Sequence, residues 1–66
     1  MKLTVNGESR EAPDGATMAQ VVATVTGQTA GVAAAINGEV VPCRAWPGTA
    51  LRDGDQVEVV TAVQGG

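Results

Sequence analysis

The stretch RDGDQVEVVT, residues 52–61, decides the fold of this 66-residue chain. An Asp-Gly turn at 53–54 opens it, and Val57 and Val59 then alternate with polar residues. The segment 56–61 is therefore predicted to be a half-buried strand with these two valines facing the core. No core-forming pattern comes after it, so this strand must complete the sheet that the earlier segments begin.

Two segments earlier in the chain predict hairpins, because each contains Asn-Gly, the strongest short hairpin signal. The first hairpin would join strands at 2–6 and 8–12, and the second would join strands at 32–36 and 39–41. Within 32–36 the even-numbered residues would face the core. A Pro-Asp-Gly turn at 13–15 ends the first hairpin.

A short helix is predicted between the two hairpins. Thr17 and Gln20 fit a capping box, in which the side chain of each residue accepts a hydrogen bond from the backbone N–H of the other. Gly27 stands where a helix C-terminus favours a left-handed residue. The helix would present one apolar stripe at helical spacing, formed by Met18, Val21, Val22 and Val25.

Residues 43–50 predict an irregular crossover with about one helical turn. Trp46, the only aromatic residue, is expected to close one end of the core. Cys43 is expected to be a small, half-buried filler rather than a sulfur relay. Asp53 and Asp55 are expected to be turn residues rather than metal ligands.

The order of elements is therefore hairpin, helix, short hairpin, crossover and final strand. One helix packed on a mixed sheet of four to five strands makes an α+β domain. If the first and last strands are parallel neighbours in the middle, the domain is a ubiquitin-like β-grasp. We expect this domain to span residues 1–61 and a flexible Gly-Gly tail to span 62–66.

Composition excludes several functions. A net charge of −3 argues against nucleic acid as a partner, because nothing here neutralises a row of phosphates. No apolar run approaches the roughly 20 residues that span a bilayer, and no signal-peptide pattern is present, so we expect a cytoplasmic protein.

The chain has no histidine and one cysteine, so it offers no Cys-His nucleophile and no ordinary zinc site. We expect no bound metal or cofactor and no catalytic activity of its own.

The chain ends in Gly65-Gly66, and this ending suggests chemistry performed on the protein by another enzyme. Glycines lack a Cβ, so the last residues can enter a channel too narrow for side chains. The carboxylate of Gly66 is unhindered, and α-carboxyl groups are ionised at neutral pH because their ordinary pKa is about 3.5. It is suited to ATP-dependent activation in a partner's active site.

Taken together, several segments resemble the ThiS family, the sulfur carrier proteins of thiamine biosynthesis. The matching segments cover residues 1–6, 14–17, 36–42, 51–58 and 60–66. The resemblance implies a β-grasp fold and a defined cycle. An adenylating enzyme of the ThiF kind would use ATP and Mg²⁺ to convert the terminal carboxylate to an acyl-adenylate. Sulfur from a cysteine desulfurase or related donor would then give a thiocarboxylate, and thiazole synthase of the ThiG kind would accept the sulfur.

The residues expected to serve this function lie at the end of the chain. Gly66 would carry the sulfur, and Val63, Gln64 and Gly65 would be held by the partner. Val60 is the outward apolar residue of the last strand, so the partner is expected to dock on the sheet face away from the helix. When free, the protein is expected to be a monomer.

Several alternatives share some of these features. The small subunit of molybdopterin synthase has the same fold and tail chemistry, but such chains tend to be richer in Phe, and this chain has none. Another sulfur-transfer pathway, such as cysteine synthesis, would use a similar carrier. A modifier attached to lysines and a passive β-grasp interaction module are the alternatives from other classes.

Overall fold

Five strands form a single mixed sheet in the order β2-β1-β5-β3-β4. The computed structural model describes residues 1–27 and 30–61. Along the chain the elements are β1 (Lys2–Val5), β2 (Glu8–Glu11), α1 (Met18–Val25), β3 (Val32–Ile36), β4 (Glu39–Val41), the 3₁₀ helix η1 (Cys43–Gly48) and β5 (Gln56–Thr61).

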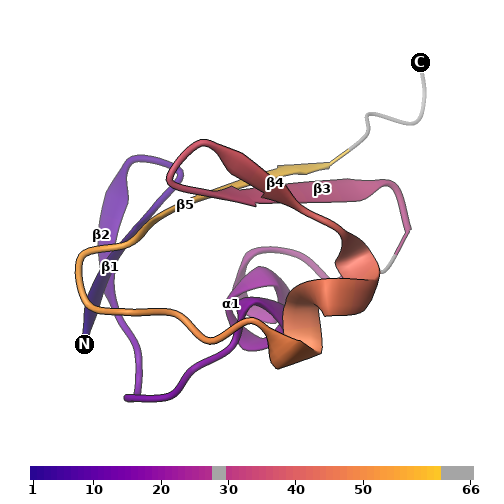
Figure 1. The fold of residues 1–66 in the computed structure, drawn as a ribbon. Helices are drawn as coiled ribbons and strands as arrows, with labels where there is room; N and C mark the ends of the chain where they lie inside the picture. The colour runs from indigo at the N-terminus through magenta and orange to yellow at the C-terminus, as the bar shows by residue number, and fades with distance from the viewer. Residues whose placement is uncertain (28–29, 62–66) are drawn as a thin grey trace.

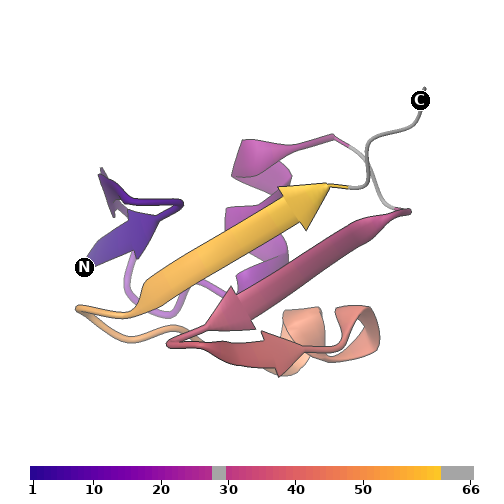
Figure 2. The ribbon, with the colours of Figure 1, turned by 90° about the horizontal axis from the view of Figure 1, so that it is seen from above.

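The last strand lies in the middle of this sheet, as the sequence predicts. β5 runs parallel to β1, with Val5 opposite Val57, and antiparallel to β3, with Ala34 opposite Val59. Figure 2 shows β5 beside β3, with β4 on the far side of β3 and the β1–β2 hairpin on the other flank. The fold is therefore the predicted β-grasp, with five strands.

The sheet forms one layer, and α1 and η1 form the other (Figure 1). The sheet curves, so that β1 and β2 descend beside the helix while β3, β4 and β5 lie across it. Alternation along the strands sends apolar residues into the space between the layers. The core has the largest fully buried side chains at its centre, namely Leu3, Val5, Met18 and Val57.

The helix begins as predicted and ends differently. Thr17 and Gln20 form a complete capping box: the backbone N–H of Gln20 donates to Thr17 Oγ1 at 3.4 Å, and that of Thr17 donates to Gln20 Oε1 at 2.9 Å. The prediction of a left-handed Gly27 is wrong. The helix ends at Val25, and its C-cap Thr26 is extended at φ −147° and still donates its N–H to the carbonyl of Val22 at 3.0 Å. That bond closes the last turn, so no left-handed residue is required at Gly27.

Each hairpin turns on Asn-Gly, and the asparagines also hold β5. Asn6 and Asn37 both have φ of 51°, which a type I′ turn requires. The Asn6 side chain accepts from the N–H of Val59 at 2.8 Å and donates to the carbonyl of Val59 at 3.2 Å. Asn6 thus replaces the missing continuation of β1, whose last two residues pair only with the first two residues of β5.

Asn37 performs the equivalent role at the other end of β5. Its side-chain oxygen accepts from the N–H of Gln56 at 3.0 Å, and its amide donates to Asp55 at 3.1 Å. Asp55 also accepts from the N–H of Arg52 at 2.8 Å. Nearby, Asp53 accepts from the N–H of Lys2 at 2.6 Å, so both acids are turn residues, as predicted.

The crossover contains one 3₁₀ helix, η1, and confirms the role of Trp46. Trp46 is only 7% exposed, and its indole N–H donates to the carbonyl of Val41 at 2.9 Å. The prediction for Cys43 is wrong, because this residue is exposed. Cys43 begins η1, and Trp46 is the residue of this turn that reaches the core.

Two kinds of feature are absent from the described residues. None of their helices is long and apolar enough to cross a membrane. Within residues 1–27 and 30–61, no group of three or more Cys, Asp or Glu side chains is placed to hold a metal ion.

Candidate functional site

The end of β5 is fixed firmly in the sheet. β3 pairs with it over five positions, the last of which sets Val32 opposite Thr61. On its other side, Asn6 holds Val59 through both side-chain hydrogen bonds. Thr61, the last described residue, therefore has a defined position at the end of β5. Figure 2 shows the direction of this central strand.

An apolar patch lies next to this position, on the sheet face away from α1. Val40 and Val60 are the exposed large hydrophobic residues among those described, at 71% and 63% exposure. Strand register places Ala33 beside Val60 and Ala35 beside Val40. We call these four residues the outer patch.

The outer patch is hollowed in the middle. The side chains of the two alanines of β3 are short, while the larger side chains of Val40 and Val60 project from the neighbouring strands. The alanines therefore line the bottom of a shallow depression, and the valines line its sides. The depression has a volume of about 260 Å³. Glu58 lines it as well, opposite Ala35, and places a carboxylate at its border.

Covering the two valines would contribute appreciably to binding. Full burial of a valine side chain is worth about 1.5–3 kcal/mol, and roughly two thirds of each is still in contact with water. A partner that covers both would gain on the order of 2–4 kcal/mol before the costs of association. This is enough to influence the affinity of a transient complex.

Of the predicted partner-binding residues, only Val60 lies among the described residues. It is exposed on the outer face, and its contact with a partner stays a prediction. The other predicted positions, Val63, Gln64, Gly65 and Gly66, lie outside the described residues. Sequence reasoning missed Val40 and the two alanines of β3. The signal that could have found them is the alternation along 32–36 and 39–41, which places them on the same face as Val60.

The mixed sheet with β1 and β5 parallel at its centre, packed on one α-helix, defines a ubiquitin-like β-grasp domain. Comparison with known families narrows this class: the model of the ThiS family matches residues 3–66. The chain belongs to the ThiS family, a family of small sulfur carrier proteins.

Solved structures agree with this placement. The crystal structure of the thiamine biosynthesis protein ThiS from Geobacter metallireducens is similar, with a TM-score of 0.82 and 30% sequence identity over 100% of both chains. A solution structure of a thiamine biosynthesis protein from the same organism gives the same TM-score and identity, covering 100% of this chain and 88% of the other. A comparison with curated proteins gave no match.

Proposed function

We propose that this chain is the sulfur carrier for thiazole formation in thiamine biosynthesis. The observation that carries the proposal is the match to the ThiS family over residues 3–66. It is supported by the outer patch, which lies beside the point where β5 leads into the Gly-Gly sequence.

The proposed cycle begins with the carboxylate of Gly66. An adenylating enzyme of the ThiF kind, using ATP and Mg²⁺, joins this carboxylate to AMP and releases pyrophosphate. The step is needed because a carboxylate is negatively charged and has no good leaving group. The persulfide sulfur of a cysteine desulfurase or related donor then displaces AMP, and a thiol reductant cleaves the resulting S–S bond to leave a thiocarboxylate on Gly66. Thiazole synthase of the ThiG kind takes the sulfur from there.

In this cycle the folded domain provides recognition and the last residues provide delivery. Threading glycines into a narrow channel costs conformational entropy, so affinity must come from elsewhere. The outer patch supplies it by burying Val40 and Val60 against the adenylating partner. Residues 62–66 would reach at most roughly 17 Å beyond Thr61 when extended. This reach suits a nucleotide site set back from the docking surface, with Val63, Gln64 and Gly65 held along the way.

Genetic complementation tests the pathway. A bacterial strain that lacks its own ThiS-type carrier needs thiamine, and expression of this chain should restore growth without it. A matched chain that lacks Gly66 should fold normally and fail to restore growth. Growth with the shortened chain would contradict the proposed chemistry.

A second strain separates the two closest sulfur-transfer functions. Cells that lack the small subunit of molybdopterin synthase should not regain the molybdenum cofactor when this chain is expressed. Rescue of that strain alone would replace the thiamine assignment by the molybdopterin one. The ThiS family match favours the thiamine assignment.

A further inference from the structure

The outer edge of β2 has a row of backbone groups that the sheet does not use. β2 is an end strand, so only β1 pairs with it. At the base of the hairpin, Met1 and Ala12 exchange both backbone hydrogen bonds, at 2.7 and 2.9 Å. Hydrogen-bonded positions alternate in an antiparallel pair, so the N–H and C=O groups of Ser9 and Glu11 point away from β1. Among the described residues, no strand pairs with this edge.

A groove runs alongside this edge, between β2 and α1. It exists because β2, with the sequence ESRE and all four residues exposed, gives no apolar side chain to cover the space. Its volume is about 220 Å³, below the range of about 300–1,000 Å³ typical of sites for small-molecule ligands. The apolar part of its lining comes from Leu3, Val5, Ala12, Pro13, Ala16 and Val21.

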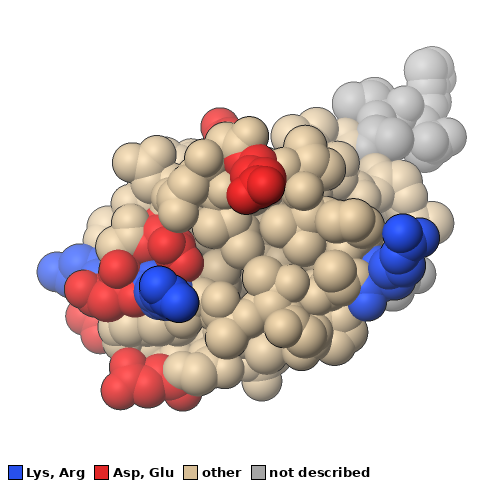
Figure 3. Space-filling model, in the orientation of Figure 1, with Lys and Arg blue, Asp and Glu red and all other residues tan. Residues whose placement is uncertain are grey.

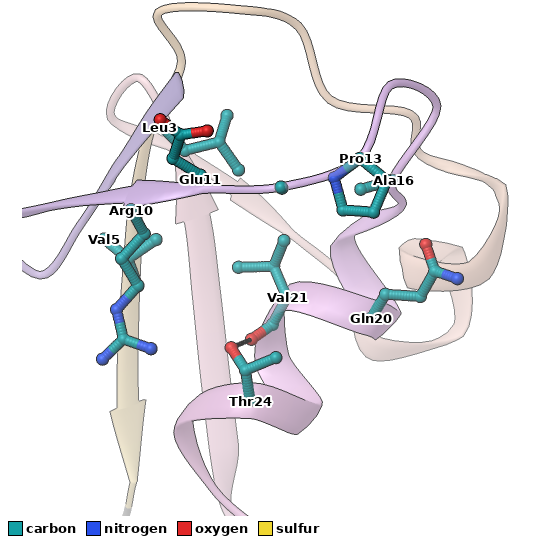
Figure 4. Close-up of a pocket in the computed structure, with 10 residues that line it drawn as sticks. Leu3, Val5, Arg10, Glu11, Pro13, Ala16, Gln20, Val21 and Thr24 are labelled. Carbon is teal, nitrogen blue, oxygen red and sulfur yellow. Dashed lines mark hydrogen bonds between the residues drawn. The ribbon is translucent and has the colours of Figure 1, made fainter. Parts of the chain in front are cut away.

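The charged side chains on β2 are divided between its two faces. Figure 4 shows Arg10 and Glu11 leaving the strand in opposite directions, with Arg10 extending toward Thr24 of α1. Arg10 is paired with Glu8 at 3.5 Å. Near the end of the hairpin, Asp14 lies 3.5 Å from the N-terminal ammonium group.

Glu11 differs from these acids, because the part of the chain that the structure describes gives it no ion pair. Figure 3 shows that acidic side chains gather at the end of the molecule where β1 and β2 lie, with basic side chains between them. A ligand at this edge therefore meets a carboxylate that forms no ion pair among the described residues, although Lys2 lies opposite it on β1.

We propose that the β2 edge and the adjoining groove bind an extended peptide segment of a partner protein, which adds a sixth strand to the sheet. The outward N–H and C=O groups of Ser9 and Glu11 match the regularly spaced backbone of an extended peptide. Successive side chains of a strand point to opposite faces. The segment therefore has aliphatic residues at alternate positions, facing the groove, and a lysine or arginine between them, opposite Glu11.

A second copy of this chain fits the site poorly through its own β2. That strand reads Glu-Ser-Arg-Glu, with nothing aliphatic to place in the groove. The site is also separate from the outer patch, which lies on β3, β4 and β5. A partner strand at β2 and an enzyme docked at the outer patch can therefore be bound at the same time.

Two capped pentapeptides test this proposal, one alternating valine with lysine and the other alternating valine with glutamate. Each is titrated into the ¹⁵N-labelled full chain and followed by NMR. The valine–lysine peptide should shift the amides of Ser9, Glu11 and Val21. It should also slow hydrogen exchange of the Ser9 and Glu11 amides, while the valine–glutamate peptide binds more weakly.

Three variants separate backbone pairing from charge. Ser9→Pro removes one outward N–H without touching the β1 ladder, and should weaken binding about fivefold to tenfold. Glu11→Lys should weaken binding of the valine–lysine peptide about twofold to fivefold and strengthen binding of the valine–glutamate peptide. Glu39→Lys makes the same charge change on β4, at the opposite edge, and should leave both affinities within about twofold.

Several results would overturn the proposal. One is the absence of any amide shift at about 1 mM peptide, the limit of weak specific binding. Another is a set of shifts centred on Val40 and Val60 instead of β2. Equal affinity for the two peptides, or an unchanged peptide affinity in Ser9→Pro, would also contradict the proposal. None of these results depends on Gly66, so the sulfur-carrier proposal is tested separately.

Discussion

Replacing Asn6 by glycine should loosen the end of β5 while preserving the turn that Asn6 forms. Glycine accepts the φ of 51° that the turn needs, so the β1–β2 hairpin keeps its connection. What disappears is the pair of side-chain hydrogen bonds to the backbone of Val59, at 2.8 and 3.2 Å. The substitution therefore isolates the contact between the hairpin turn and β5.

The expected loss of stability can be worked out from these two bonds. A typical intramolecular hydrogen bond contributes about 0.5–1.5 kcal/mol net, so two give about 1–3 kcal/mol. Glycine relieves backbone strain at this position but also costs more entropy on folding, and the two effects are of similar size, on the order of 1 kcal/mol. Since the contact is only partly buried, we expect a net loss of about 1–2 kcal/mol, or about 5–15 °C in Tm for a domain of this size.

Urea unfolding and hydrogen exchange together measure this effect. Urea unfolding gives the change in free energy, and NMR exchange of the Val59 amide reports whether the bond to Asn6 is the one lost. Asn6→Asp is a matched variant that keeps the acceptor for the Val59 N–H and loses the donor to its carbonyl. Its Val59 amide should stay better protected than in Asn6→Gly.

The result that would refute this reasoning is simple to recognise. If Asn6→Gly is as stable as the parent chain and the Val59 amide exchanges at the same rate, the contact does not hold β5. Asn37→Gly provides a comparison at the other end of the strand. There only one of the two side-chain bonds goes to the backbone, so a smaller loss is expected.

Three further predictions concern single side chains. Trp46→Phe removes the indole hydrogen bond to the carbonyl of Val41 and leaves a small void, so urea unfolding should show a free energy of unfolding about 1–2 kcal/mol lower. An unchanged free energy would mean that this hydrogen bond contributes nothing to stability. Val60→Asp should leave the unfolding free energy within about 0.5 kcal/mol of the parent value, because the residue is exposed. It should weaken binding to the adenylating partner at least about tenfold in calorimetry. Equal affinity would exclude the outer patch as the docking surface. Cys43→Ser should change the unfolding free energy by less than about 0.5 kcal/mol, because the residue is exposed. It should also leave the rate of thiocarboxylate formation, measured by mass spectrometry, unchanged. A stalled reaction would mean that this exposed thiol relays sulfur.

Local signals account for most of the correct fold prediction. The two Asn-Gly turns and the Thr17–Gln20 capping box depend on residues close in sequence, and both were predicted correctly. The alternation in 56–61 predicted β5 and the inward direction of Val57 and Val59. The central position of β5 was one arrangement that a single helix and two hairpins allow, and the resemblance to the ThiS family implied it.

The errors concern features that depend on contacts between distant segments. Gly27 has the right residue type for a left-handed helix end, but the chain leaves the helix in an extended conformation at Thr26. Cys43 is apolar enough for the interior, yet Trp46 takes the one core position that this turn provides. The second role of Asn6 was also invisible, because it requires Val59 to lie beside the hairpin turn.

The candidate site was predictable only in part, for the same reason. Val60 can be inferred from alternation within a single strand. The hollow of the outer patch requires β3 to lie between β4 and β5, an order that no local signal specifies. The groove beside β2 depends likewise on how the first hairpin packs against α1.

The most direct test of the central claim is the intact mass of the chain after incubation with a ThiF-type adenylating enzyme, ATP, Mg²⁺ and a sulfur donor. We predict that one oxygen is replaced by sulfur and that fragmentation places the sulfur on Gly66. An unchanged mass with a partner shown to be active, or sulfur found on Cys43 instead, would contradict the claim that the terminal carboxylate carries the chemistry.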